Sequence, residues 1–88
     1  MVLLDLLGRR WALRVIWELR DGARLSFRDL LAASQTSPSV LNTRLAELRE
    51  SGIVLHDGDG YALTPIGADL LARLMPLHDW AEAWAKGR

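Results

Sequence analysis

The feature that most constrains the fold of this sequence is a pair of helix-start signals, the second of which follows a short polar turn. The stretch Ser26–Asp29 fits a capping box, in which a serine caps a helix and an acidic residue follows three positions later. Ser37-Pro38 supplies a second start, with serine as N-cap and proline at the first helical position. The polar residues 34–36 form a turn between the first of these helices and the second. Two short helices joined in this way predict a helix-turn-helix, with its second helix at residues 38–50.

Apolar periodicity predicts further helices on both sides of this motif. Residues 2–7 are largely apolar, and from residue 10 to residue 20 apolar side chains recur at i, i+3, i+4 and i+7 before Asp21-Gly22 ends the helix. Thr64-Pro65 repeats the cap-and-proline start and opens a last helix. Pro76 is expected to kink or divide that helix.

Between residue 52 and residue 64 the pattern changes to that of strands. Residues 53–55 and 61–63 are apolar and flank the run Asp57–Gly60, whose Asp-Gly pairs are strong hairpin signals. We therefore predict a mainly α (α+β) fold, a winged helix-turn-helix with a short two-stranded wing. Residues 1–88 are expected to form a single DNA-binding domain of this kind, with an extra dimerisation helix at each end.

Composition excludes several classes of site. The chain has no cysteine, so it cannot form disulfides or thiolate metal sites. The run Asp57–Gly60 resembles the start of a calcium loop, but Tyr61 and Ala68 stand where further ligands are required. His56 and His78 lack a suitably spaced partner, so we expect no metal and no cofactor. No nucleophile motif or phosphate-binding loop is present, and we expect no enzyme activity. Without a signal peptide or a membrane-length apolar run, a cytoplasmic protein with no membrane partner is expected.

The charge distribution is asymmetric although the net charge is zero. Residues 1–49 carry eight arginines against five acidic residues (+3), whereas residues 50–88 carry three cations against six acidic residues (−3). All but one of the cations are arginine, the side chain best suited to forked phosphate contacts. Genome composition bias explains the arginine content equally well, so the asymmetry indicates only which half would face a nucleic acid.

Several stretches, taken in order, resemble HxlR-type transcriptional regulators, which have a MarR-like winged helix. Gly8–Leu13 with Leu19–Gly22 is similar to the opening of that family, and Ser37–Val54 is similar to its recognition helix and the segment after it. Tyr61–Thr64 with Gly67, and Trp80 further on, resembles its closing strand and last helix. The resemblance covers nearly the whole chain. It implies a prokaryotic regulator that acts as a homodimer with the recognition helix in the major groove.

The sequence departs from this family in ways that concern its trigger and its wing. The cysteine that many members use for redox sensing is absent, so thiol redox sensing cannot apply, and a small-molecule effector stays open. Ser26-Phe27 replaces an Arg-Phe pair that is common before the second helix. The hairpin is short and acidic, and because phosphates repel carboxylates we expect the wing to contribute little to DNA binding.

A helix buried through Leu41, Leu45 and Leu48 presents its opposite side to a partner. On that side Asn42 is suited to bind adenine through two hydrogen bonds. Arg44 flanks the buried stripe, where it reaches a phosphate or pairs with Glu47 or Glu50. The predicted DNA-binding residues are Thr36, Ser37, Ser39, Asn42, Thr43 and Arg44. Arg24 and Arg28 are weaker phosphate candidates. The alternative is that these polar side chains are only solvated surface.

Surplus apolar residues near both ends predict a homodimer on a roughly palindromic site, because so small a core cannot bury them all. The predicted interface residues are Val2, Leu3, Leu6, Leu74, Leu77, Trp80 and Trp84. Two alternatives remain: the terminal helices pack on each other within one chain, or the tryptophans line a ligand pocket. The neutral charge and acidic hairpin also leave open a winged-helix module that binds proteins and has little DNA affinity.

Overall fold

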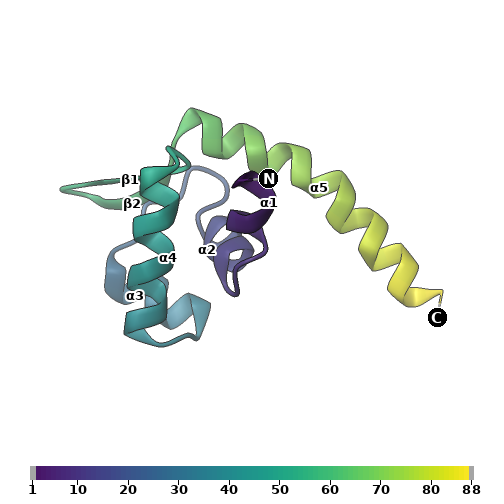
Figure 1. The fold of residues 1–88 in the computed structure, drawn as a ribbon, viewed down its shortest axis with the longest axis horizontal. Coiled ribbons are helices and arrows are strands. Elements are labelled where there is room, and N and C mark those ends of the chain that lie inside the picture. The colour runs from purple at the N-terminus through teal and green to yellow at the C-terminus, as the bar shows by residue number, and fades with distance from the viewer. Residues whose placement is uncertain (1, 88) are drawn as a thin grey trace.

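The computed structural model of this chain describes residues 2–87, and side chains from residue 5 onward. In order, its elements are α1 (Val2–Leu7), α2 (Ala12–Glu18), α3 (Phe27–Ser34), α4 (Pro38–Glu50), β1 (Val54–Asp57), β2 (Gly60–Leu63) and α5 (Pro65–Lys86). The hairpin projects from one end of the molecule and α5 from the other (Figure 1). This order confirms the predicted winged helix-turn-helix with a further helix at each end.

The three helix starts expected from serine and threonine caps are present. The Asp29 amide donates to Ser26 Oγ at the start of α3 (3.1 Å), and the Val40 amide donates to Ser37 Oγ at the start of α4 (3.2 Å). Thr64 caps α5 in the same way. Because these caps satisfy amides that have no partner within the helix, they fix where each helix begins.

Helix α2 is shorter than the periodicity predicts, spanning Ala12–Glu18 instead of residues 10–20. Trp11 at its N-cap has a left-handed backbone (φ 77°), which is incompatible with a helix starting earlier. At the other end, Asp21 and Gly22 also have positive φ values (61° and 73°) and turn the chain toward α3. The apolar stripe is therefore present, but the helix is shorter at both ends than the stripe predicts, because the backbone leaves the helical conformation there.

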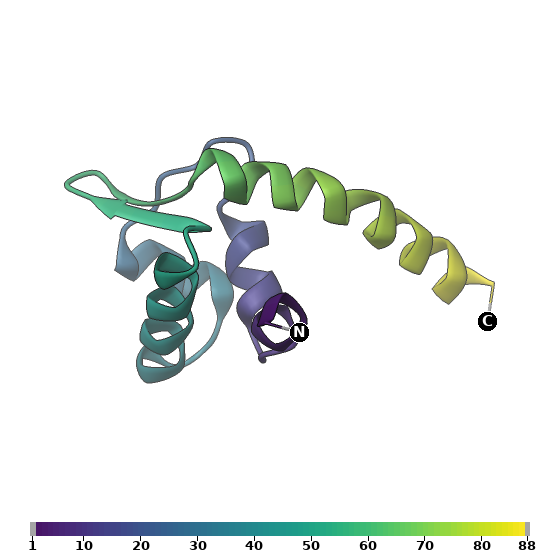
Figure 2. The same ribbon diagram turned by 45° about the horizontal axis from the view of Figure 1, so that its top comes forward.

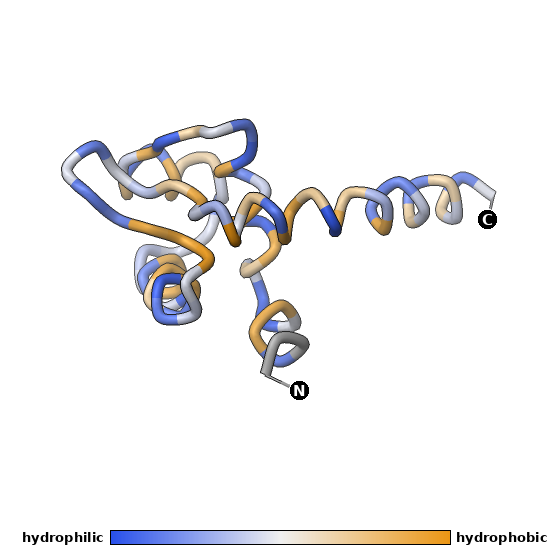
Figure 3. The backbone as a smooth tube through the Cα atoms, turned by 90° about the horizontal axis from the view of Figure 1, so that it is seen from above, coloured by the Kyte–Doolittle hydropathy of each residue, from blue (hydrophilic) through white to orange (hydrophobic). Residues whose placement is uncertain are grey.

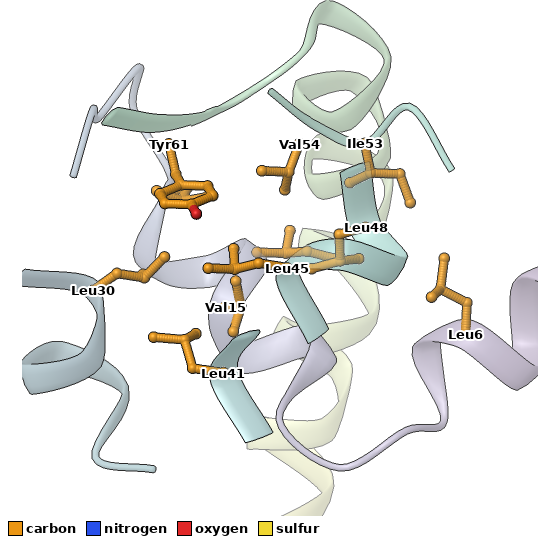
Figure 4. Packing of buried hydrophobic residues seen from close by; sticks show 11 residues of the cluster. Leu6, Val15, Leu30, Leu41, Leu45, Leu48, Ile53, Val54 and Tyr61 are labelled. Atoms are coloured by element: carbon orange, nitrogen blue, oxygen red, sulfur yellow. The ribbon is translucent and has the colours of Figure 1, made fainter. Parts of the chain in front are cut away.

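The core is one cluster of buried side chains centred on the inner face of α4. Leu41, Leu45 and Leu48 are almost completely buried there, which confirms the stripe expected for this helix. They meet side chains from α2, α3 and the hairpin (Figure 4). The remaining members of the cluster are Leu6, Val15, Ile16, Leu19, Leu30, Ile53, Val54 and Tyr61. This packing fixes the orientation of α4 in the molecule.

The wing is a tight hairpin with a third backbone partner. β1 and β2 pair antiparallel, and the Asp57–Gly60 pair closes the turn at the Asp-Gly signals. Leu25, before α3, also exchanges two backbone hydrogen bonds with Tyr61 (3.0 and 2.8 Å). A side chain at Gly60 would lie 2.6 Å from the Leu25 carbonyl oxygen, so this close approach requires glycine. The additional pairing, which the sequence did not predict, anchors the wing to the body.

Helix α5 is continuous from Pro65 to Lys86, so of the two effects expected of Pro76, a kink or a division, the division is wrong. The helix bends gently along its length and shows no break (Figure 2). Proline removes one amide donor, but Pro76 is exposed and water can satisfy the carbonyl group that loses its partner. No helix in the described part of the chain, α5 included, is both long enough and apolar enough to cross a membrane.

The terminal helices lie on either side of a groove. Both α1 and α5 pack against α2. The groove, of about 900 Å³, lies between α1, the end of α4 and the first half of α5, with Leu6, Ile53 and Leu70 among its lining residues. The alternative in which the terminal helices mainly cover each other within one chain is therefore not the arrangement observed.

Candidate nucleic-acid interface

The outward face of α4 is exposed along its first three turns. Ser39, Asn42, Thr43 and Ala46 all lie on it, opposite the buried leucines. The helix lies at the edge of the molecule, away from α5 (Figure 2). An exposed helix of 13 residues, held by its apolar side and joined to α3 by a turn at residues 35–37, has the shape required to enter a DNA major groove.

The polar side chains on this face differ in how many of their hydrogen-bond donors and acceptors are free to bind a partner. Thr43 Oγ1 donates to the Ser39 carbonyl oxygen one turn earlier (2.9 Å), so this hydroxyl donor is engaged within the helix. Ser37 Oγ accepts the Val40 amide and lies 3.5 Å from Ser39 Oγ. Within the described residues, the side-chain amide group of Asn42 has no hydrogen-bond partner. Asn42 is therefore the side chain on this face with the most unused hydrogen-bonding capacity.

Arg44 does not join these residues on the outward face. Its Nη1 pairs with Glu47 Oε1, its side chain is 18% exposed, and its Nε is buried. Glu47 also receives Arg9 from the loop after α1, through Oε2 (2.7 Å). Of the two roles considered for Arg44, the structure shows the pair with a neighbouring glutamate. The Arg9 contact was not predicted, because no local pattern links residues so distant in sequence.

The start of α4 collects the other candidate residues. Thr36 is half-buried immediately before the Ser37 cap, and Ser39 lies in the first turn. Backbone amides at a helix start carry a partial positive charge and suit a phosphate group. The structure thus brings Thr36, Ser37, Ser39, Asn42 and Thr43 together along the first half of α4, and leaves Arg44 apart from them.

Most arginines of the first half of the chain are paired with acidic side chains. The pairs are Arg9–Glu47, Arg14–Glu18, Arg20–Asp21, Arg24–Asp57 and Arg44–Glu47. Of the arginines in the helix-turn-helix itself, Arg28 and Arg49 are exposed and form no ion pair with any described residue. Arg24–Asp57 joins the two halves of the chain, whereas the other four pairs use acidic residues of the first half, so the positive excess of that half is offset only in part.

The wing tip is an acidic turn that forms an ion pair with the side chain of Arg24. Asp57 Oδ2 accepts from Arg24 Nη1 (2.6 Å), and Asp57 Oδ1 accepts the Asp59 amide (2.9 Å). The Asp59 hydrogen bond, followed by the Arg24 contact, lowers the pKa of Asp57. Arg24, considered as a phosphate ligand, is therefore engaged with the wing. Within the described residues, no three potential metal ligands gather here or elsewhere.

The outer half of α5 carries an exposed apolar surface. Leu77 and Trp80 are each 61% exposed and Trp84 is 52% exposed, and the two indole rings stack with centroids 6.0 Å apart. Leu74 is half-buried. Leu6, by contrast, is 9% exposed and belongs to the core, so little of it is free to contact a second chain.

Two further residues predicted for the dimer interface, Val2 and Leu3, belong to α1. Their side chains lie outside the described residues.

Comparison with known proteins agrees with the geometry. The sequence model of a family described as HxlR-like helix-turn-helix matches residues 6–88. YvaP of Bacillus subtilis (strain 168), an uncharacterized HTH-type transcriptional regulator, is 30% identical over 87 residues, covering 91% of this chain and 81% of that protein.

Solved structures share the fold. Quinone-bound YodB of B. subtilis matches with a TM-score of 0.86 at 30% identity, over 93% of each chain. A structure described as a MarR-family transcriptional regulator from Enterococcus faecalis V583 matches with a TM-score of 0.82 at 27% identity, over 96% of this chain and 83% of that one. The chain belongs to the HxlR-like helix-turn-helix family of transcriptional regulators.

Proposed function

We propose that this protein is a homodimeric regulator that binds a specific, roughly palindromic duplex DNA site through α4. The observation that carries the proposal is the exposed polar face of α4, which is held rigidly from behind by its leucines. Membership of a family of transcriptional regulators supports a DNA partner. In this arrangement α4 enters the major groove and the first half of the helix approaches the base edges.

The contacts divide into base reading and backbone positioning. Asn42 reads a base edge, because its free amide offers both a donor and an acceptor. Thr36, Ser37 and the first amides of α4 hold a phosphate at the helix start. Arg28 on α3 and Arg49 on α4 are the exposed cations that neutralise further phosphates. The wing contributes little, since Asp57 and Asp59 form its tip.

A second copy of the chain covers the exposed face of α5 in this proposal. The helix extends well away from the core, and apolar residues recur along it (Figure 3). Exposed large residues such as Leu77 and Trp80 mark an association surface more often than free solvent-facing surface. Two-fold pairing also places two α4 helices on one side of a duplex, where half-sites lie roughly 34 Å apart.

The trigger of such a regulator acts without thiol chemistry. YodB has been seen with quinone bound. The present chain has no cysteine, so a quinone or any other effector would have no thiol to modify. We propose that an effector of this protein, if it has one, binds non-covalently.

The test is selection of bound duplexes from a random pool, followed by titration of the enriched site. Asn42→Ala should weaken binding by about 1–3 kcal/mol, the value of one bidentate base contact. Arg73→Ala, on α5 and outside the helix-turn-helix, serves as the matched exposed control and should change affinity little. A lack of enrichment even at low salt would refute the proposal and favour the protein-binding module.

A further inference from the structure

Thr43 presents a methyl group, and not a hydroxyl donor, to whatever approaches α4. Its Oγ1 donates to the Ser39 carbonyl oxygen at 2.9 Å, so the hydroxyl is turned back along the helix. The Cγ2 methyl is then the free end of an exposed side chain. Ala46, close by on the same exposed face, adds a second methyl group. Asn42 therefore lies between the Ser39 side chain, one turn earlier, and the two methyl groups of Thr43 and Ala46.

The same face has no guanidinium in the part that approaches bases. The side chain best suited to guanine is arginine, which binds O6 and N7 together. Arg44 is the arginine in the middle of α4, but Glu47 Oε1 holds its Nη1. Arg9 occupies the other Glu47 oxygen (2.7 Å) and fixes the carboxylate in place. Arg49 lies in the last turn, whereas recognition helices contact bases mainly with their N-terminal residues.

From this arrangement, and resting on the proposed function, we infer that α4 reads a half-site core of A·T pairs. Asn42 binds an adenine through N6 and N7, and the methyl groups of Thr43 and Ala46 pack on the C5 methyl groups of neighbouring thymines. Glu47 is a positioning residue: by holding Arg44 away from the outward face, it removes the guanine reader from the helix.

The thymine methyl groups can be removed one at a time. In the enriched duplex each core thymine is replaced by deoxyuridine, which keeps base pairing and deletes only the C5 methyl. At each thymine that packs on Thr43 or Ala46, the wild-type protein should lose about fourfold in affinity per half-site, the value of burying one methyl group. Thr43→Ser keeps the hydroxyl and loses the methyl, so at one of these positions, the thymine that packs on Thr43, it should bind the thymine and deoxyuridine duplexes equally. Thr43→Val keeps the methyl and should retain the thymine preference.

The outcomes separate this inference from the proposed function. An enriched site with a G·C core, or equal wild-type affinity for thymine and deoxyuridine at every core position, overturns the inference while leaving DNA binding intact. A Thr43→Ser protein that keeps the thymine preference at every position where the wild type shows it also overturns the inference. Failure to enrich any duplex is instead the failure of the proposed function, and the inference falls with it.

The role of Glu47 has a test of its own. Glu47→Gln keeps the side-chain shape and removes the charge that holds Arg44, so selection with this variant should enrich guanine in the half-site core. Thermal unfolding verifies that the variant is folded before selection. A folded variant that selects the same A·T core as the wild type overturns the role assigned to Glu47.

Discussion

Gly67 lies where the first turn of α5 meets the backbone at the start of the wing, and replacing it with alanine gives a sharp test of this packing. A β-carbon at this position would stand 3.1 Å from the Ile53 carbonyl carbon and well inside 3.0 Å of its oxygen, a separation that real β-carbons do not show. The first turn of α5 must therefore move away from Ile53. That movement strains the hydrogen bonds from the Thr64 amide to the Ile53 oxygen (3.0 Å) and from Thr64 Oγ1 to the Gly52 oxygen (2.6 Å).

Two effects of opposite sign decide the size of the change. Alanine is preferred to glycine in a helix interior by about 1 kcal/mol. Overpacking against backbone costs about 2 kcal/mol, and weakening the hydrogen bonds of Thr64 costs about 1 kcal/mol more. The net expectation for Gly67→Ala is a loss of about 2 kcal/mol of unfolding free energy, which lowers Tm by roughly 8–16 °C in a domain of this size.

Thermal unfolding at one fixed protein concentration measures this change, since association would otherwise shift Tm. Gly58→Ala is the matched control, because a β-carbon there meets nothing within 4 Å and its φ is not in the left-handed region. The control should stay within about 0.5 kcal/mol of the wild type. A Gly67→Ala protein as stable as the wild type, or more stable, would refute the packing argument and show that helix propensity alone governs this position.

Three further predictions concern α5 and the wing. Pro76→Ala restores an amide donor inside a continuous helix, so it should raise the free energy of unfolding by up to about 3 kcal/mol, and Tm and helix content with it. An unchanged Tm would contradict this. The Asp57 pKa lies below its ordinary 3.8, so the stabilisation by its carboxylate is present above that pH and is lost as pH falls through the lowered pKa. In thermal melts at acid pH, the difference in unfolding free energy between the wild type and Asp57→Asn should accordingly shrink below pH 3.8. A difference that stays constant with pH would contradict this prediction. Trp80→Ala should raise the dimer dissociation constant about tenfold or more in sedimentation equilibrium, and an unaltered dimer would place the interface elsewhere.

Local signals in this sequence were strong enough to predict most of the fold. The cap at Ser37 and the proline after it fixed the start of α4, and a leucine every three or four residues fixed its buried side. The Asp-Gly pairs marked the wing turn. These features were predictable because each depends on residues close together in sequence, whose preferences do not need the rest of the molecule.

Features that depend on distant residues were not predictable in the same way. The Leu25–Tyr61 pairing and the Arg9–Glu47 ion pair join segments that meet only after the chain has folded. For the same reason the sequence did not show that Arg24, a weaker phosphate candidate, is held by Asp57 across the fold. At Pro76 a local rule was applied too strictly, since an exposed helix can accommodate a proline without dividing.

The salt dependence of duplex binding tests the central claim most directly. If Arg28 and Arg49 of two subunits each neutralise one phosphate, the four contacts give a slope of log affinity against log salt of about −3.6. Affinity for the enriched site should then fall about 150-fold between roughly 50 and 200 mM salt. Arg49→Gln should make the slope shallower by about 1 per substituted contact. Absence of duplex binding at 50 mM salt, or binding insensitive to salt, would contradict the account of this protein as a DNA-binding regulator.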